Sequence, residues 1–199
     1  MDTALELFLT TGYEKTTIQD IVKKVNVAQG TFYYYFSSKE AVMEAIFARH
    51  VRTMLGRAQS AHLKDIPVLE RLQLLINNFY GLCQYDESGL IARMLYKEKQ
   101  GELINRLWRQ MQLIAAPLFT GILEQGNQEG VLHVRHIEES LAFFAGIMAA
   151  LLEASSPTEF GHESNPEVIN NKRIIAAKLI ETLFGTPAGC IRLEEVQKC

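Results

Sequence analysis

Apolar residues recur every three or four positions along most of the chain, whereas runs in which apolar and polar residues alternate are almost absent. Three- and four-residue spacing is that of helices that each bury one face. The pattern therefore predicts an all-α protein with about nine helices. The predicted spans are 2–11, 17–24, 28–35, 39–57, 66–84, 87–97, 102–127, 136–154 and 167–184.

Capping residues precede three of these spans. A hydroxyl residue stands three positions before Gln or Glu in residues 16–19 (TTIQ) and 37–40 (SSKE), which is the spacing of a capping box. An asparagine cap is followed by proline in residues 165–167 (NPE). The polar segment 155–165 is typical of a mobile connection, and we expect the tail after Pro187 to be frayed.

Residues 17–36 contain a short helix, a tight link and a second short helix, which is the order of a helix-turn-helix. Asn26 stands in the link, where the turn needs a left-handed backbone that asparagine tolerates well. The residues expected to pack the two helices together are Ile21, Val25, Val27 and Phe32.

The second helix carries side chains that suit DNA. The three consecutive tyrosines 33–35 cannot all face one core, so some of their hydroxyls must lie outside. Tyrosine and threonine hydroxyls donate to phosphate, and glutamine can pair with the major-groove edge of adenine. Gln29, Thr31, Tyr33 and Tyr34 are therefore candidates for DNA contact. The alternative is that the tyrosines only join this small domain to the next helix.

Composition narrows the class of protein. A net charge of -3 argues against a surface that is basic throughout and leaves a locally basic face. The longest apolar stretch, residues 141–152, is too short to span a bilayer, and the N-terminus does not resemble a secretory signal. We therefore expect a cytoplasmic protein with no membrane partner. The scattered Cys83, Cys190 and Cys199 fit reduced thiols and no zinc site.

The N-terminal residues strongly resemble those of the TetR (tetracycline repressor) family of transcriptional regulators. The matched positions are Ala4 to Phe8, Gly12, Tyr13, Thr16 to Ile18, Asp20, Ile21, Val27 and Gly30 to Glu40. A weaker resemblance lies in residues 117–131. The resemblance implies an N-terminal three-helix DNA-binding domain, residues 1–45, and a C-terminal helical domain for effector binding and dimerisation, residues 46–199.

The resemblance also implies DNA-contact positions. Thr17 and Gln19 would lie at the edge of the contact, and Lys39 matches a family phosphate contact. The residues implied at its centre are Gln29, Gly30, Thr31, Tyr33 and Tyr34. No arginine lies in span 28–35, so recognition of guanine by an arginine is not expected to be the main source of sequence specificity. We also predict that the affinity for DNA depends only weakly on salt concentration, on the order of a few phosphate charges per half-site.

The span 136–154 is apolar nearly all round, which is typical of a helix buried on two sides. The resemblance implies that the last two helices form a dimer interface with their copies in a second chain. The residues expected there are Phe143, Ile147, Ala150, Leu151, Ile175, Leu179 and Leu183. The alternative is that span 136–154 is the central core helix of a monomer.

A pocket for a mainly apolar effector is expected among the fifth to eighth helices, because aromatic and methionine side chains gather there. The candidate lining residues are Phe79, Tyr80, Cys83, Met94, Leu95, Trp108, Met111, Gln112, Ala115, Phe119 and Phe144. Each of them could instead be plain core.

The predicted function is a homodimeric repressor that a small effector releases from a near-palindromic double-stranded DNA operator. The alternative is a helix-turn-helix protein of chromosome organisation or protein interaction that has no effector. We expect no enzyme, because a glycine-rich phosphate loop and a nucleophile elbow are both missing from the sequence. We expect no cofactor or metal either, since His133 and His136 are more typical of solvated loop histidines.

Overall fold

The computed structural model describes residues 1–57, 65–82, 87–155 and 165–193. These residues form helices and contain no strand, which confirms the predicted all-α class. The helices are α1 (Asp2–Thr11), α2 (Ile18–Val25), α3 (Gln29–Tyr35), α4 (Lys39–Arg57), α5 (Val68–Leu82), α6 (Glu87–Lys97), α7 (Gly101–Gln128), α8 (Ile137–Ser155) and α9 (Pro166–Phe184). Each predicted span agrees with the observed helix to within two residues at either end.

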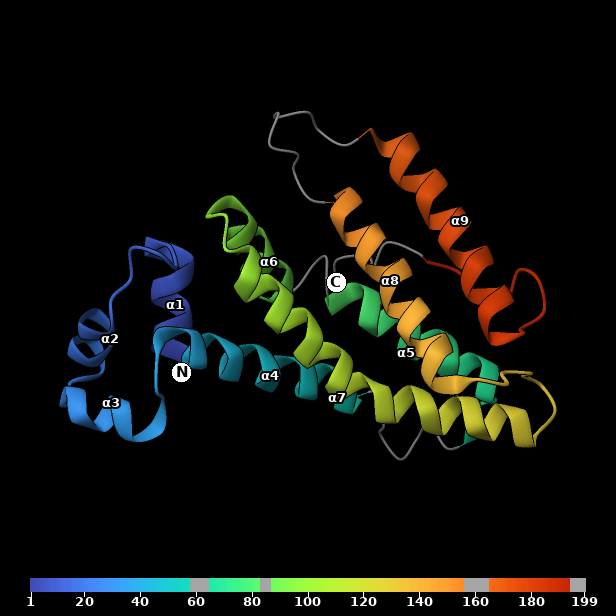
Figure 1. Cartoon of the computed structure of the whole chain (residues 1–199), viewed down its shortest axis with the longest axis horizontal. Helices are drawn as coiled ribbons and strands as arrows, with labels where there is room; N and C mark the ends of the chain where they lie inside the picture. The colour runs from blue at the N-terminus through green and yellow to red at the C-terminus, as the bar shows by residue number, and fades with distance from the viewer. Residues whose placement is uncertain (58–64, 83–86, 156–164, 194–199) are drawn as a thin grey trace.

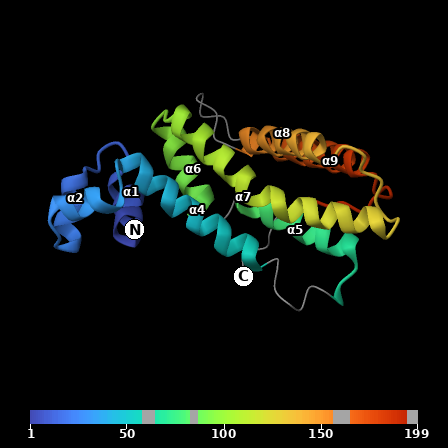
Figure 2. The same cartoon turned by 60° about the horizontal axis from the view of Figure 1, so that its bottom comes forward.

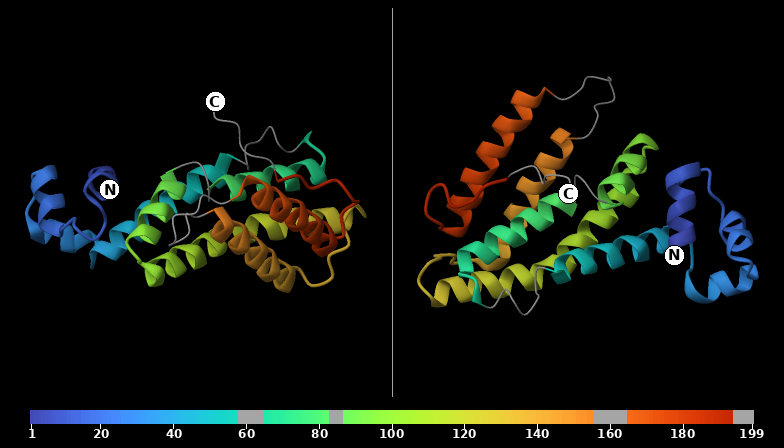
Figure 3. Two further views of the ribbon diagram at one scale, coloured as in Figure 1. Left: turned by 90° about the horizontal axis from the view of Figure 1, so that it is seen from above. Right: turned by 180° about the vertical axis from the view of Figure 1, so that it is seen from behind.

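A small lobe made of α1, α2 and α3 lies at one end of the molecule, and α4 leads from it into the body (Figure 1). The long helix α7 extends through the body and packs on both α4 and α5 (Figure 2). Helices α8 and α9 lie side by side along one side of the body. The views from above and from behind show the lobe projecting beyond the body, held by α4 (Figure 3).

Two helix caps lie one residue later than the predicted boxes. The Thr17 hydroxyl accepts from the Asp20 backbone N–H, and the Asp20 carboxylate accepts from the Thr17 backbone N–H, so Thr17 and not Thr16 is the N-cap of α2. The hydroxyl of Thr16 is buried and donates to the carbonyl of Gly12 at 2.6 Å. In α4 the Ser38 hydroxyl accepts from a backbone N–H in the first turn. The Asn165 cap of α9 is confirmed.

One continuous apolar core joins the lobe to the body. Ile21 and Phe32 are buried in it as predicted, but Val25 and Val27 are exposed. Both valines flank the left-handed turn, which directs them outward, and Val22 packs inside in their place. The core is continuous through α4, which connects the lobe to the body.

The chain after α9 is ordered as far as residue 193, which makes the prediction of a frayed tail wrong for this segment. The backbone N–H of Ile191 donates to the Glu181 carboxylate at 2.9 Å. The Gln73 side chain of α5 donates to the carbonyl of Arg192 and accepts from its N–H. Ile191 and Leu193 are buried, so burial and hydrogen bonds both hold the tail. The predicted mobile connection falls almost wholly on residues 156–164, outside the described residues.

Candidate functional site

The turn between α2 and α3 has the geometry that a helix-turn-helix requires. Asn26 adopts φ 55° and ψ 48°, the left-handed conformation predicted for it. Its N–H donates to the carbonyl of Lys23, and the N–H of Val27 donates to the carbonyl of Val22. These bonds end α2, and α3 follows at Gln29 with Ala28 as its N-cap. The second helix of the motif therefore begins where the sequence indicated.

Helix α3 buries a single side chain, that of Phe32, and exposes the others. Gln29, Gly30 and Thr31 are exposed near its N-terminus, and Tyr33 and Tyr34 are exposed farther along. Tyr34 is 82% exposed, and its ring meets that of Tyr35 edge to face at 4.9 Å. Tyr35 was not among the predicted contacts, although the run of three tyrosines pointed to it. The structure thus places all the predicted α3 residues on one accessible lobe.

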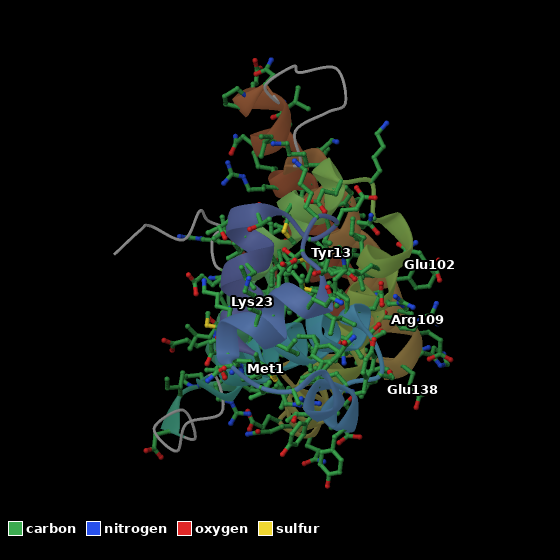
Figure 4. All side chains as sticks on the ribbon, turned by 90° about the vertical axis from the view of Figure 1, so that its left-hand side faces the viewer. Met1, Tyr13, Lys23, Glu102, Arg109 and Glu138 are labelled. Carbon is green, nitrogen blue, oxygen red and sulfur yellow. The ribbon has the colours of Figure 1, made fainter. Side chains whose placement is uncertain are left out.

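The first turn of α2 lies on the same lobe, which faces the viewer in Figure 4. The Thr17 hydroxyl donates to the Asp20 carboxylate at 2.6 Å, so it is occupied by its own helix cap. Hydrogen bonds from Thr17 lower the pKa of the Asp20 carboxyl. The groups that remain for a phosphate are the exposed Gln19 side chain and the first N–H groups of α2, which have no partner within the helix.

Lys39 has a different position from the one that the resemblance implied. Its ammonium donates to the carbonyl oxygens of Tyr13, Glu14 and Thr16 at 2.7, 3.2 and 3.0 Å. It also lies 4.4 Å from the centre of the Tyr13 ring. An ammonium group has three N–H donors, and here all three are used within the protein. Lys39 therefore fastens α4 to the α1–α2 loop, and a phosphate contact does not fit this arrangement.

The α1–α2 loop is also tied to the body. The Glu98 carboxylate, just after α6, accepts from the backbone N–H of Glu14 at 2.7 Å. Gly12 packs against the same carboxylate, at φ 101°, where a side chain would be strained and would meet it at 2.6 Å. Farther along, Arg106 of α7 pairs with Glu44 of α4 at 3.2 Å. Two contacts thus connect the α6–α7 region with the lobe and its supporting helix.

Tyr13 fills the space beneath this loop. Its ring packs on Phe8 at 5.2 Å, and Tyr13 is almost fully buried. Burial raises the pKa of its phenol, and the neighbouring charge of Glu40 raises it further. The phenol is therefore neutral, and the ring supports the Lys39 ammonium through its face.

A cavity of about 240 Å³ opens between α7 and α8, with Phe79 of α5 at its base. Arg109 and Glu138, labelled in Figure 4 on the same side of the molecule, belong to its wall. The full lining is Phe79, Arg109, Gln112, Leu113, Ala115, Ala116, Phe119, Glu138, Leu141, Ala142, Phe144 and Ala145. Most of this wall is apolar.

Five of the predicted pocket residues line the cavity, and five do not. Phe79, Gln112, Ala115, Phe119 and Phe144 belong to its wall. The remaining described ones pack in or against the core, namely Tyr80, Met94, Leu95, Trp108 and Met111. Cys83 lies outside the described residues.

The cavity opens on the α8 side of α7, whereas Met111 faces α7's core side. Positions 109, 112, 113 and 116 share the cavity-facing side of the helix, at a spacing of three and four residues. Most of this face was not among the predicted pocket residues, and neither were the first turns of α8. The signal that could have identified this face lies in α7 itself, whose residues 109, 112, 113 and 116 form a second face beside the one that packs in the core.

Helices α8 and α9 expose apolar side chains on the outside of the body. Phe143 is 69% exposed, and Ile175 and Leu179 are also exposed. Ala150 is exposed, and Ile147 and Leu183 are half-buried. Leu151, in contrast, is buried within the subunit at 4% exposure. It follows Phe144 and Met148 on the core-facing side of α8, so its assignment to the dimer interface is wrong.

The described residues give no sign of two other kinds of site. No helix among them is long and apolar enough to cross a membrane. No group of three His, Cys, Asp or Glu side chains that could hold a metal ion occurs in the same part of the chain.

Comparisons with known proteins agree with this geometry. Residues 1–46 match the family model of bacterial regulatory proteins of the tetR family. The fatty acid metabolism regulator protein of Bacillus subtilis (strain 168) is 25% identical over 130 residues, which cover 65% of this chain and 67% of that protein.

Two solved structures share the fold. RolR in complex with resorcinol has a TM-score of 0.66 at 17% identity, over 94% of this chain and 86% of that one. FadR from Bacillus subtilis in complex with stearoyl-CoA has a TM-score of 0.57 at 19% identity, over 94% of this chain and 96% of that one. The matched N-terminal residues, which include the exposed α3, therefore belong to the tetR family of bacterial regulatory proteins, and the all-helical body shares the fold of these two structures.

Proposed function

We propose that the chain is a homodimeric repressor that binds a near-palindromic operator through α3 and leaves it when a small, mainly apolar molecule enters the α7–α8 cavity. The observation that carries this proposal is α3 itself. It buries only Phe32 and offers glutamine, threonine and tyrosine side chains to the outside. These groups read base edges and bind phosphates. The protein would act in the cytoplasm, where the DNA is.

Residues 1–45 would form the DNA-binding domain and residues 46–199 the effector and dimerisation domain. A dimer is supported by the apolar outer face of α8 and α9, since monomers rarely expose contiguous apolar patches of that kind. A two-fold axis through this face would place two copies of α3 in successive major grooves, about 34–36 Å apart.

Effector control is supported by the path from the cavity to the lobe. Helix α7 carries Arg109 and Gln112 of the cavity, and one turn earlier it carries Arg106, which pairs with Glu44 of α4. A ligand that prefers one arrangement of α7 and α8 would therefore bias the position of α4 and of both recognition helices. A coupling of about 1–3 kcal/mol is typical of such control. RolR and FadR, which share the fold, were solved with small molecules bound.

The Gln29→Ala substitution tests the role of α3. We expect it to relax preference at one base position of the operator by about 1–3 kcal/mol, because a single glutamine reads a single base pair. Tyr33→Phe, which removes a phosphate donor, should instead weaken binding to all sequences. The measurement is the affinity of each variant for operator duplexes changed one base pair at a time. Equal losses on specific and random DNA for Gln29→Ala would show that its assigned role is incorrect.

The Glu98→Ala substitution tests the connection between body and lobe. Because it removes the acceptor of the Glu14 N–H, we expect faster hydrogen exchange in residues 12–16 and an operator affinity reduced by roughly threefold to tenfold. Glu98→Gln keeps an acceptor oxygen and should restore both properties. Glu102→Ala, at an exposed position in the first turn of α7, is the matched control. Wild-type exchange in Glu98→Ala would contradict this connection.

A further inference from the structure

We infer that the effector is a neutral molecule with one aromatic ring and a hydroxyl group, and not a carboxylate or a long acyl chain. The inference rests on the proposed function in one respect, that the α7–α8 cavity is the effector site. Three properties of the cavity carry it: its volume, the shape of its apolar wall, and the charges on its wall.

The volume limits the ligand to a small molecule. Pockets for drug-sized ligands measure about 300–1,000 Å³, and a cavity of about 150 Å³ in another protein holds benzene. At about 240 Å³, the cavity has room for one ring and its substituents. The acyl chain of stearoyl-CoA, the ligand in the FadR structure, needs far more space.

The wall favours a flat aromatic ligand. Phe144 packs on Phe119 at 4.9 Å and on Phe79 at 5.5 Å, and the rings are tilted against each other. The three rings are almost fully buried, so they form the floor of the cavity, where a further ring can pack on them in offset or edge-to-face contact. Ala115 and Ala116 of α7 and Ala142 and Ala145 of α8 also line the cavity. Their small side chains leave a slot between the two helices.

The polar groups favour a neutral ligand. Arg109 and Gln112 of α7 and Glu138 of α8 are the cavity's polar residues, so one positive and one negative charge balance. Neither charged side chain is joined by a hydrogen bond or ion pair to another residue in the described part of the chain. A phenolic hydroxyl can donate to the Glu138 carboxylate and accept from Gln112 or Arg109. A carboxylate can pair with Arg109, but it offers no donor to the Glu138 carboxylate and is repelled by it, so one of the two wall charges stays unsatisfied.

The protein contains its own probe for this test. Trp108 is the single tryptophan of the chain. Its ring lies 5.9 Å from that of Phe79, which lines the cavity. Ligand entry should therefore change the fluorescence of the full-length protein without any label.

The test is a titration of the full chain with phenol, benzoate and stearoyl-CoA, followed by Trp108 fluorescence. We expect phenol to saturate the fluorescence change with a Kd roughly tenfold lower than that of benzoate, which corresponds to about 1.4 kcal/mol. Stearoyl-CoA below its micelle concentration should not compete with phenol for the cavity. Tighter binding of benzoate or stearoyl-CoA, or no saturation by phenol, overturns the inference. Operator binding by the ligand-free protein is measured separately and tests the proposed function on its own.

Two charge-removing variants separate recognition from a structural effect. Glu138→Gln removes the negative charge and should raise the affinity for benzoate several-fold relative to phenol. Arg109→Gln should move the same ratio in the opposite direction. If the ratio of benzoate affinity to phenol affinity stays at the wild-type value in both variants, Arg109 and Glu138 do not determine the preference for a neutral ligand.

A third variant tests the location of the site. Ala142→Phe fills the slot and should weaken phenol binding by roughly tenfold or more. Ala188→Phe makes the same change at an exposed position outside the cavity and should bind phenol like the wild type. Unchanged phenol affinity in Ala142→Phe, with circular dichroism equal to that of the wild type, places the binding elsewhere and overturns the inference.

Discussion

Replacing Lys39 with methionine is expected to lower the free energy of unfolding by about 2–4 kcal/mol, because three hydrogen bonds from a charged donor are lost. The carbonyls of Tyr13, Glu14 and Thr16 would lose a donor while the loop around them stays partly buried. The affinity for the operator should also fall roughly tenfold, because the α1–α2 loop no longer holds α4 in place. Urea unfolding followed by circular dichroism and operator titration measure the two effects.

Lys24→Met is the matched control. Lys24 also lies in the lobe, but its ion pair with Glu6 is largely exposed and contributes less than about 1 kcal/mol. If Lys39 instead contacted phosphate, its substitution would leave stability unchanged and reduce the salt dependence of binding by about one phosphate charge. That result would contradict the internal role of Lys39.

Phe144→Ala is expected to lower the free energy of unfolding by about 3–5 kcal/mol. Phe144 is 2% exposed and contacts the rings of Phe79, Phe119 and Phe184. Its removal would open the wall of the α7–α8 cavity into the core. Urea unfolding at a fixed protein concentration measures the loss, and Trp108 fluorescence reports the change around Phe79.

Phe143→Ala, one residue earlier in α8, removes a side chain of the same type that is exposed on the outside of the subunit. Phe143 is exposed in the subunit, so its loss should leave subunit packing intact and raise the Kd of the dimer. Sedimentation over a range of concentrations separates the two variants. Equal effects of Phe143→Ala and Phe144→Ala on dimer dissociation would show that the outer face of α8 is not the interface.

The helices could be predicted from the sequence because each carries its own periodic pattern and its own end signals. The exact caps could not, because adjacent hydroxyls compete for the same position. Thr16 and Thr17 have similar chemistry, and only the folded structure shows that Thr16 is buried against Gly12 while Thr17 caps α2. The same holds for Ser37 and Ser38.

The site was predictable only where local sequence determines it. The exposure of α3 follows from three tyrosines in a row and from the turn at Asn26. The position of Lys39 depends on a loop more than twenty residues earlier in the chain, and the cavity depends on which faces of α7 and α8 meet. These relations between distant segments leave no periodic signal in a single sequence.

The most direct test of the central claim is a selection of bound duplexes from a random DNA pool, followed by sequencing and by the mass of the complex. We expect enrichment of a near-palindrome whose half-sites are centred about 10–10.5 base pairs apart, or a multiple of that distance, with at least two chains bound. Selection with Gln29→Ala should relax one position in each half-site. A pool without enrichment, or an asymmetric sequence bound by one chain, would contradict a two-fold pair of α3 helices that reads DNA.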